Sequence, residues 1–276
     1  MAAAETTTPG QLSFAIETFE RIHPTEFQRR FLSQGTRHDG RGFAQFRPTH
    51  IVRSTISTAQ GSATVRIGNT TVVCGIKAEV SEPDVSTPKA GYLVTNVELS
   101  PMCSARFRPG APSEQAQVAS EHISRLFQSA IDVESLGIEE GRACWVLYAD
   151  IVCIKHDGNV LDAAIVALQA ALRDLQLPKV EFDAVSGVVS ADKSKMQPLE
   201  VEALYPTTLS VLDGNYLVAD ADDAEEQMAA SSVLVVLTDS AVANIWKRGA
   251  LVERKLVEKC VAMAEARKQE LATLLN

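Results

Sequence analysis

The sequence has few aromatic residues and lacks any long run of apolar residues. Phenylalanine, tyrosine and tryptophan together make up only 5% of its 276 residues, although 46% are hydrophobic. No stretch reaches the ~18 consecutive apolar residues that a membrane-spanning helix needs. Residues 1–10 also lack the basic and apolar pattern of a secretory signal. We therefore expect a nuclear or cytosolic protein that does not bind a membrane.

The cysteines lack the paired spacing of a disulfide framework or a zinc site. Three of the five lie in strongly apolar, strand-like segments. Cysteine in such segments behaves as a small buried hydrophobe, and its thiol stays free in a reducing compartment. The pattern favours free thiols over disulfides or metal ligands, and the sequence predicts no metal or cofactor. The five positions are Cys74, Cys103, Cys144, Cys153 and Cys260.

Positive charge is scarce and unevenly placed. The formal net charge is −9, which argues against a protein that binds nucleic acid with its whole surface. Residues 1–76, however, contain eight arginines against five acidic residues, a balance of +3, which leaves −12 for residues 77–276. This distribution favours a member of an assembly over a lone RNA-binding protein. Ion pairs within the molecule would explain the same arginines equally well.

A pattern of hairpin and strand occurs twice in the chain. A first hairpin is predicted at 63–78 around a Gly-Asn turn, and a strand at 49–54 precedes it. A second hairpin is predicted at 208–220 around another Gly-Asn pair, and a strand at 232–238 follows it. Because each hairpin is accompanied by a long helix, the pattern indicates a duplicated unit of β and α elements.

The duplication predicts an α/β (α+β) fold built from repeated hairpin and helix units. The chain length also exceeds the usual size of one core, which favours two packed halves. We expect a partly disordered N-terminal extension at 1–24, a first domain at 25–190 and a second domain at 191–276. The second domain should end in a long helix at 253–275 that packs on its sheet.

In the middle of the chain, a buried strand is predicted to turn sharply into a buried helix. Residues 149–155 are apolar and rich in β-branched side chains, and Asp-Gly-Asn at 157–159 has the composition of a turn. Apolar residues then recur at helical spacing from Leu161 onwards. Asn159 is the expected N-cap, and Asp162 should place its carboxylate near free backbone N–H groups of the first turn.

The remaining elements are predicted from local signals. A short helix should run to residue 34, capped by Thr25 or the preceding turn, and a longer one should follow the cap Ser113. A strand is expected at 92–99. Residues 178–206 contain three prolines and are interpreted as a connection between the two halves.

Several motifs, taken in order, resemble one known family. The sequence is similar to the RNase PH family of phosphorolytic exoribonucleases over roughly residues 25 to 270, and within it to ring subunits of the RNA exosome. The resemblance implies an RNase PH-like fold built from units of the ribosomal protein S5 domain 2-like type, with two mixed sheets and helices packed between and around them. The motifs are Arg37-His38-Asp39-Gly40-Arg41, Gly61-Ser62-Ala63, Gly68 to Gly75, Arg106-Phe107-Arg108, Ala116 to Ser120, Trp145 to Tyr148, and the Asp157-Gly158-Asn159 turn with Asp162-Ala163-Ala164.

The resemblance also implies that the catalytic groups are missing. In active members, the turn after the central strand reads Gly-Gly-Ser/Thr-Arg, and its hydroxyl and guanidinium groups hold phosphate. Val160 and Leu161 occupy those two positions here, and neither side chain can bind an anion. Active members also place two aspartates six residues apart, and the matching positions hold Glu226 and Ser232. We therefore expect no phosphorolytic activity from this chain alone.

Three arginines match positions that contact RNA or a neighbouring subunit in ring assemblies of the family. Arg106 and Arg108 precede the helix capped by Ser113, and Arg125 lies on that helix, on the same outer face as His122. An ordinary exposed arginine is the alternative for each. His156 lies beside an aspartate, but no nucleophile stands at a recognisable spacing, so a catalytic role is not predicted for it.

Three functions are compatible with the sequence. The leading hypothesis, implied by the resemblance, is a non-catalytic structural subunit of the exosome core. Its partners would be other RNase PH-like subunits in a hetero-hexameric ring, RNA-binding cap subunits, catalytic nuclease partners and RNA in the channel. Its roles would be rRNA 3' maturation and RNA turnover in nucleus, nucleolus and cytoplasm. The alternatives are an active phosphate-dependent 3'-to-5' exoribonuclease and a free RNA-binding adaptor, which the net charge disfavours.

Overall fold

The chain divides into two compact units. The computed structural model describes residues 16–182, 189–250 and 253–275. One unit comprises residues 1–43 and the other residues 44–276. Within the described residues, no helix is both long enough and apolar enough to cross a membrane.

The N-terminal unit contains two short helices, α1 (Ile16–Ile22) and α2 (Pro24–Ser33). Proline at the first position of α2 is suited to a helix start, because its fixed backbone angle fits and no amide N–H is needed there. Of the two predicted caps, Thr25 is wrong and the preceding turn is right: the N-cap is His23, although its side chain makes no capping bond. The ring of Phe27 packs edge-on against that of Phe31, with centroids 5.0 Å apart.

The larger unit begins with a six-stranded sheet in the order β1-β2-β3-β6-β4, with β5 pairing to β6. The pairing of β4 with β6 is parallel and the other pairings are antiparallel, so this sheet is mixed as predicted. The predicted first hairpin is confirmed as β2 and β3. The strands are β1 (Thr49–Arg53), β2 (Gly61–Ile67), β3 (Thr70–Ser81), β4 (Tyr92–Leu99), β5 (Gly137–Glu139) and β6 (Ala143–Lys155).

A second sheet of four strands, in the order β10-β9-β11-β12, is antiparallel throughout, so only the first sheet is mixed. The second predicted hairpin is confirmed as β9 and β10. Strand β12 was not predicted. Its residues are exposed along nearly the whole strand, so they lack the alternation by which a half-buried strand is recognised. The strands are β9 (Tyr205–Leu212), β10 (Tyr216–Ala219), β11 (Ala229–Leu237) and β12 (Val242–Gly249).

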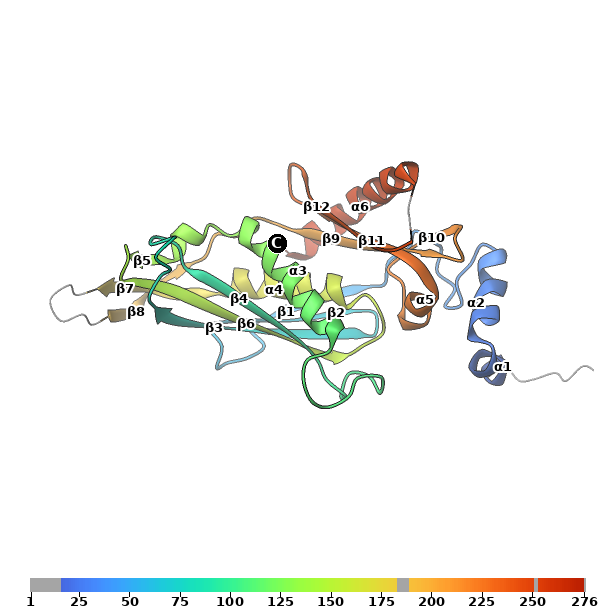
Figure 1. Cartoon of the computed structure of the whole chain (residues 1–276), viewed down its shortest axis with the longest axis horizontal. Helices are drawn as coiled ribbons and strands as arrows, with labels where there is room; N and C mark the ends of the chain where they lie inside the picture. The colour runs from blue at the N-terminus through green and yellow to red at the C-terminus, as the bar shows by residue number, and fades with distance from the viewer. Residues whose placement is uncertain (1–15, 183–188, 251–252, 276) are drawn as a thin grey trace, which may run out of the picture. The chain divides into compact units, whose positions relative to one another are not determined.

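The helices of this unit cover the sheets, and α4 lies between the two of them (Figure 1). Twelve of the fifteen residues of α4 are buried, which explains its almost wholly apolar sequence. Helix α6 packs on β9 and β11, as predicted for the C-terminal helix. This arrangement confirms the predicted α/β class. The helices are α3 (Glu114–Ala130), the 3-10 helix η1 (Val133–Leu136), α4 (Val160–Asp174), α5 (Asp223–Met228) and α6 (Arg254–Leu275).

The interpretation of residues 178–206 as a connection is wrong for most of that segment. It contains much of an antiparallel hairpin, β7 (Gln176–Phe182) and β8 (Val189–Pro198), which forms a two-stranded sheet of its own. Figure 1 shows it at the end of the first sheet, beside β5. The predicted domain boundary at 190/191 falls inside β8.

A buried ion pair joins the first sheet to the second. Arg47 lies just before β1, and its guanidinium donates two hydrogen bonds of 2.8 Å to the carboxylate of Asp220, which follows β10. The backbone N–H of Arg47 donates a third bond, also 2.8 Å, to the same carboxylate. Burial alone would raise the pKa of Asp220, but the bonds and charge of Arg47 outweigh it and lower that pKa to about 2. Asp220 is therefore a buried anion whose charge is neutralised by Arg47.

Removing the guanidinium should strongly destabilise the protein. Arg47→Met leaves the Asp220 carboxylate buried without its counter-charge, so we expect the free energy of unfolding to fall by about 3–5 kcal/mol. Urea unfolding of the full chain measures this. Lys77→Met removes an exposed cation from β3 of the same sheet and should change stability by less than about 0.5 kcal/mol. Equal effects of the two substitutions would contradict the assignment.

Candidate functional site

The turn between β6 and α4 has a backbone that few residues adopt. Gly158 and Asn159 both have positive φ angles, 73° and 52°. A Cβ atom on Gly158 would lie 2.5 Å from the carbonyl oxygen of Ala221, so only glycine fits against the chain that leads into α5. The turn between β6 and α4 therefore lies close to residues 220–226, which belong to the segment that connects β10 and β11 of the second sheet.

Asn159 is the N-cap residue of α4, but the predicted capping bond is not made. Its side chain accepts no bond from its own helix. The amide Nδ2 instead donates a 2.7 Å bond to Asp220, and the backbone N–H of Asn159 donates a 2.6 Å bond to the carboxylate of Glu226. Asp162 lies in the first turn of α4, as predicted, but its carboxylate accepts bonds from the backbone N–H and hydroxyl of Thr208. Both polar groups therefore bind the second half of the chain.

The four positions predicted to match a lost catalytic site converge on one cavity of about 490 Å³. Val160 and Leu161 reach it from the first turn of α4, Glu226 from α5 and Ser232 from β11. Residues more than sixty positions apart in the sequence thus line the same space. The placement agrees with the alignment on which these positions were chosen, while their function stays a prediction.

Three further residues of the cavity were not predicted as site residues. His122 comes from α3, and Trp246 and Arg248 come from β12. The rings of His122 and Trp246 lie with centroids 4.0 Å apart, so His122 packs against β12. Sequence reasoning missed Trp246 and Arg248 because it missed β12 itself.

Glu226 is the most unusual acid in the cavity. Burial is the main cause that raises its pKa, to about 7, and the nearby Asp223 carboxylate adds to the effect. The hydrogen bond from the N–H of Asn159 works in the opposite direction, because it stabilises the charged form. The backbone N–H at the start of α4 therefore already has a carboxylate as its partner.

Beside the cavity, Arg106 forms an ion pair and does not project freely into solvent. Its guanidinium donates a 2.6 Å bond to Asp223 and lies 3.0 Å from Nε2 of His156. His156, Asp223 and Glu226 offer ligand atoms within 4.8 Å of one another, a spacing compatible with a metal ion. Arg106 already contacts two of these three residues. Burial lowers the pKa of His156, and the charge of Arg106 lowers it further. The guanidinium of Arg106 thus occupies the position that a metal ion would take between these side chains.

Arg108 and Arg125 lie elsewhere. Arg108 is exposed and makes no hydrogen bond or ion pair with any residue that the structure describes. Arg125 projects from α3 and pairs with Glu121 of the preceding turn at 2.6 Å. The three predicted contact residues therefore differ in their partners.

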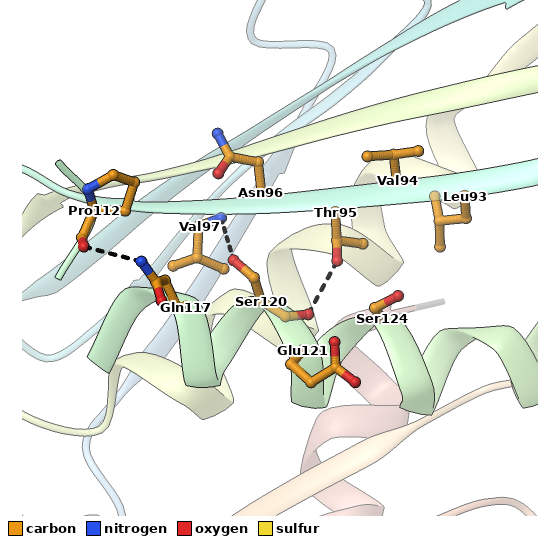
Figure 2. A pocket seen from close by; sticks show the side chains of 10 residues that line it. All are labelled: Leu93, Val94, Thr95, Asn96, Val97, Pro112, Gln117, Ser120, Glu121 and Ser124. Atoms are coloured by element: carbon orange, nitrogen blue, oxygen red, sulfur yellow. Dashed lines mark hydrogen bonds between the residues drawn. The ribbon is translucent and has the colours of Figure 1, made fainter. Parts of the chain in front are cut away.

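A second groove, of about 430 Å³, lies between the edge strand β4 and α3 (Figure 2). Ser120 joins its two walls, because its hydroxyl accepts a 2.8 Å bond from the N–H of Val97 and its carbonyl accepts a bond from the hydroxyl of Thr95. Among the residues that the structure describes, Glu121 is the only ionisable one that lines this groove. Without a basic side chain, the groove is poorly suited to an anionic ligand.

The raised pKa of Glu226 predicts a specific dependence of stability on pH. The folded protein holds this proton up to about pH 7, whereas the unfolded chain releases it near 4.5. Stability should therefore fall as pH rises through this range, by up to about 3 kcal/mol. Glu226→Gln keeps a hydrogen-bond acceptor for Asn159 and should remove that part of the decline.

Urea unfolding between about pH 5 and pH 8 measures the stability of the unsubstituted chain and of Glu226→Gln. Glu121→Gln replaces an exposed acid, so its stability should change with pH in the same way as that of the unsubstituted chain. Parallel curves for the unsubstituted chain and Glu226→Gln would contradict the raised pKa.

Comparisons with known proteins agree with this geometry. Residues 45–178 match the 3' exoribonuclease family, RNase PH, domain 1. The chain is 38% identical to the exosome complex component rrp43 of Schizosaccharomyces pombe, over 93% of this chain and 97% of that protein. It is 35% identical to the exosome complex component Rrp42 of Methanopyrus kandleri, over 86% of this chain and 90% of that protein.

Solved structures give the same result. A chain of the Archaeoglobus fulgidus exosome, determined with RNA bound to the active site, superimposes with a TM-score of 0.81 at 28% identity, covering 90% of this chain and 96% of that one. A chain of an archaeal exosome core superimposes with a TM-score of 0.77 at 26% identity, covering 94% and 99%. With relatives matched along nearly their whole length, this chain belongs to the RNase PH family and to its exosome component members.

Proposed function

We propose that this chain is a non-catalytic structural subunit of an exosome core ring. It would pair with other RNase PH-like subunits in a six-membered ring and support 3'-to-5' RNA processing and degradation by shaping the RNA channel. RNA-binding cap subunits and nuclease partners complete the assembly in this proposal. The relatives support membership in the assembly, because they are exosome components matched over nearly the whole chain.

The bond between Asn159 and Glu226 carries the proposal that the chain is inactive. A phosphate site at this turn needs N–H, hydroxyl and guanidinium donors. Here the N–H of Asn159 already donates to a carboxylate of the same chain, 2.6 Å away, and the next two side chains are those of Val160 and Leu161. An entering phosphate would find this N–H already bound to the Glu226 carboxyl group and would meet no side-chain donor at these two positions.

The missing carboxylate supports the same proposal. Ser232 lines the cavity where active relatives are expected to place an aspartate. A serine hydroxyl can neither hold a metal ion as a carboxylate does nor act as a general acid at neutral pH. Phosphate binding and proton or metal handling would therefore both fail in the same cavity.

We further propose that RNA contact falls mainly on Arg108. Arg106 is held by Asp223, and Arg125 by Glu121, whereas Arg108 has no such partner among the described residues. A flexible, unpaired guanidinium can bind a phosphate without first breaking an ion pair.

We also propose that the chain contains two RNase PH-like halves, at 25–190 and 191–276. In this proposal the protein is located in the nucleus, nucleolus and cytoplasm.

The isolated full chain should not degrade RNA when inorganic phosphate is supplied. An active RNase PH-like relative assayed in parallel shows that the reaction conditions are sound. Purification of the tagged chain from cells should bring down RNase PH-like subunits in equal amounts, detected by mass spectrometry. Phosphate-dependent degradation by the isolated chain would overturn the proposed inactivity, and purification without such subunits would overturn the proposed assembly.

Arg108→Glu should weaken crosslinking of RNA to this chain within the assembled ring, because it replaces a phosphate-binding cation with an anion. Arg254→Glu reverses an exposed charge on α6 and serves as the matched control. We expect a loss of about threefold or more for Arg108→Glu and no change for the control. Unchanged crosslinking of Arg108→Glu would remove this residue from the RNA path.

A further inference from the structure

A row of polar side chains crosses the second sheet on the face that lines the cavity at the start of α4. Ser232 of β11 pairs with Ser210 of β9 on one side and with Arg248 of β12 on the other. Directly opposed residues on neighbouring strands point to the same face of a sheet. All three residues line the cavity of about 490 Å³. The second sheet therefore contributes two hydroxyl groups and a guanidinium group to one wall of the cavity.

The alternation along β12 shows that this row faces the cavity. Trp246, two residues before Arg248, lines the same cavity, and its ring packs against that of His122 on α3. Lys247, which lies between Trp246 and Arg248, does not line it. Because successive side chains of a strand point to opposite faces of the sheet, Arg248 and Trp246 share the cavity face. The polar row thus has an aromatic neighbour on its own side of the sheet.

The donors of this row have no partner among the residues that the structure describes. The hydroxyl groups of Ser210 and Ser232 make no hydrogen bond there, and the guanidinium of Arg248 makes neither a hydrogen bond nor an ion pair. Arg248 is exposed, Ser232 is half-buried and Ser210 is only 1% exposed. An anionic group that entered the cavity would therefore meet a charged donor and hydroxyl donors that no other group already uses.

The acids of the cavity decide which kind of anion fits. Glu226 is held at the start of α4, where its carboxyl group accepts a backbone N–H and where the charges of Arg47 and Arg106 act on it. Glu114 lies at the exposed start of α3, where water screens its charge. Since both acids line the same cavity as Arg248, a singly charged anion is repelled less than a doubly charged one such as phosphate. A carboxylate is the singly charged group that matches a guanidinium with two parallel bonds.

We propose that this cavity binds a carboxylate group carried on an apolar stem, with Arg248 and the hydroxyl groups of Ser232 and Ser210 as its donors. The stem would pack against Trp246 and the aliphatic side chains of the lining, such as Leu234. The cavity volume is sufficient for a group of small-molecule or side-chain size. Two sources offer this chemistry: an acidic side chain of another protein, and a free carboxylic acid. The site rests on the cavity alone and does not depend on the proposed ring assembly.

Binding can be followed on the full chain through its two tryptophans. Trp145 on β6 and Trp246 at the cavity give two indole N–H signals in an NMR spectrum, and Trp246→Phe identifies the second. N-acetyl-glutamate methylamide represents a protein side chain, and hexanoate represents a free acid. Hexan-1-ol and hexylamine carry the same stem without a negative charge, and inorganic phosphate is the doubly charged comparison.

We expect at least one of the two acids to shift the Trp246 signal and to leave the Trp145 signal in place. That acid should bind about tenfold or more tightly than hexan-1-ol. The tighter of the two acids identifies the source, and equal affinities mean that both sources can use the site. Arg248→Gln should reduce the affinity by about tenfold or more, because it removes the charge that pairs with the carboxylate. Lys247→Gln removes an exposed cation from the opposite face of β12 and should leave the affinity unchanged.

Ser232→Asp tests the row independently of Arg248. An aspartate at this position places a negative charge beside the ligand, so we expect the affinity for the acid to fall by about tenfold or more. Retention of both indole signals shows that each variant is folded. No Trp246 shift with either acid, equal affinity for hexan-1-ol, hexylamine or phosphate, or unchanged affinity in Arg248→Gln or Ser232→Asp would overturn the proposal.

Discussion

The ion pair between Arg47 and Asp220 is the interaction on which the site depends. It lies where the first sheet, the turn before α4 and the second sheet meet, because Arg47 also donates a 2.6 Å bond to the backbone carbonyl of Asp157. The carboxylate of Asp220 in turn accepts a hydrogen bond from the side-chain amide of Asn159. One buried carboxylate thus holds the turn in its unusual conformation and places the second sheet beside it. A buried charge can persist only when it is paired and fully hydrogen-bonded, and this one is.

The same network determines the chemistry of the cavity. With Asn159 fixed by Asp220, its backbone N–H points to Glu226, and its side-chain oxygen is left without a donor. A turn that resembles an anion-binding loop has therefore become rich in acceptors. Val160 and Leu161 offer no side-chain donor at this turn, while the carboxyl group of Glu226 accepts the backbone N–H at the helix start. In the proposed function, the loss of phosphate binding would thus be a change of polarity and not only a loss of contacts.

The elements that sequence patterns predicted well are those with local signals. The hairpin β2–β3, the hairpin β9–β10 and helix α4 each carry a turn motif or a clear period of apolar residues, and each was confirmed. Strand β12 gave no such signal, since it is exposed along nearly its whole length. The hairpin β7–β8 was missed because prolines and charged residues gave it the composition of a loop, and its strands pair with each other. Arg47 and Asp220 are 173 residues apart, and no local pattern links them.

The site itself was predicted only in part. Val160, Leu161, Glu226 and Ser232 were found through resemblance to a family, and the structure places all four at one cavity. The capping bond expected of Asn159 is not made because a tertiary partner, Asp220, takes its side-chain amide, and the first-turn carboxylate of Asp162 likewise binds a tertiary partner, Thr208. Propensity describes what a residue can do within its own turn of the chain. It does not include partners that folding brings from elsewhere.

The most direct test of this account follows the amide N–H signal of Asn159 during a pH titration, with and without inorganic phosphate. The bond to Glu226 predicts an inflection near pH 7, which Glu226→Gln abolishes and which phosphate does not move. If phosphate shifts this signal or displaces its inflection, the turn still binds the anion, and the claim that Glu226 has taken the place of phosphate would be wrong.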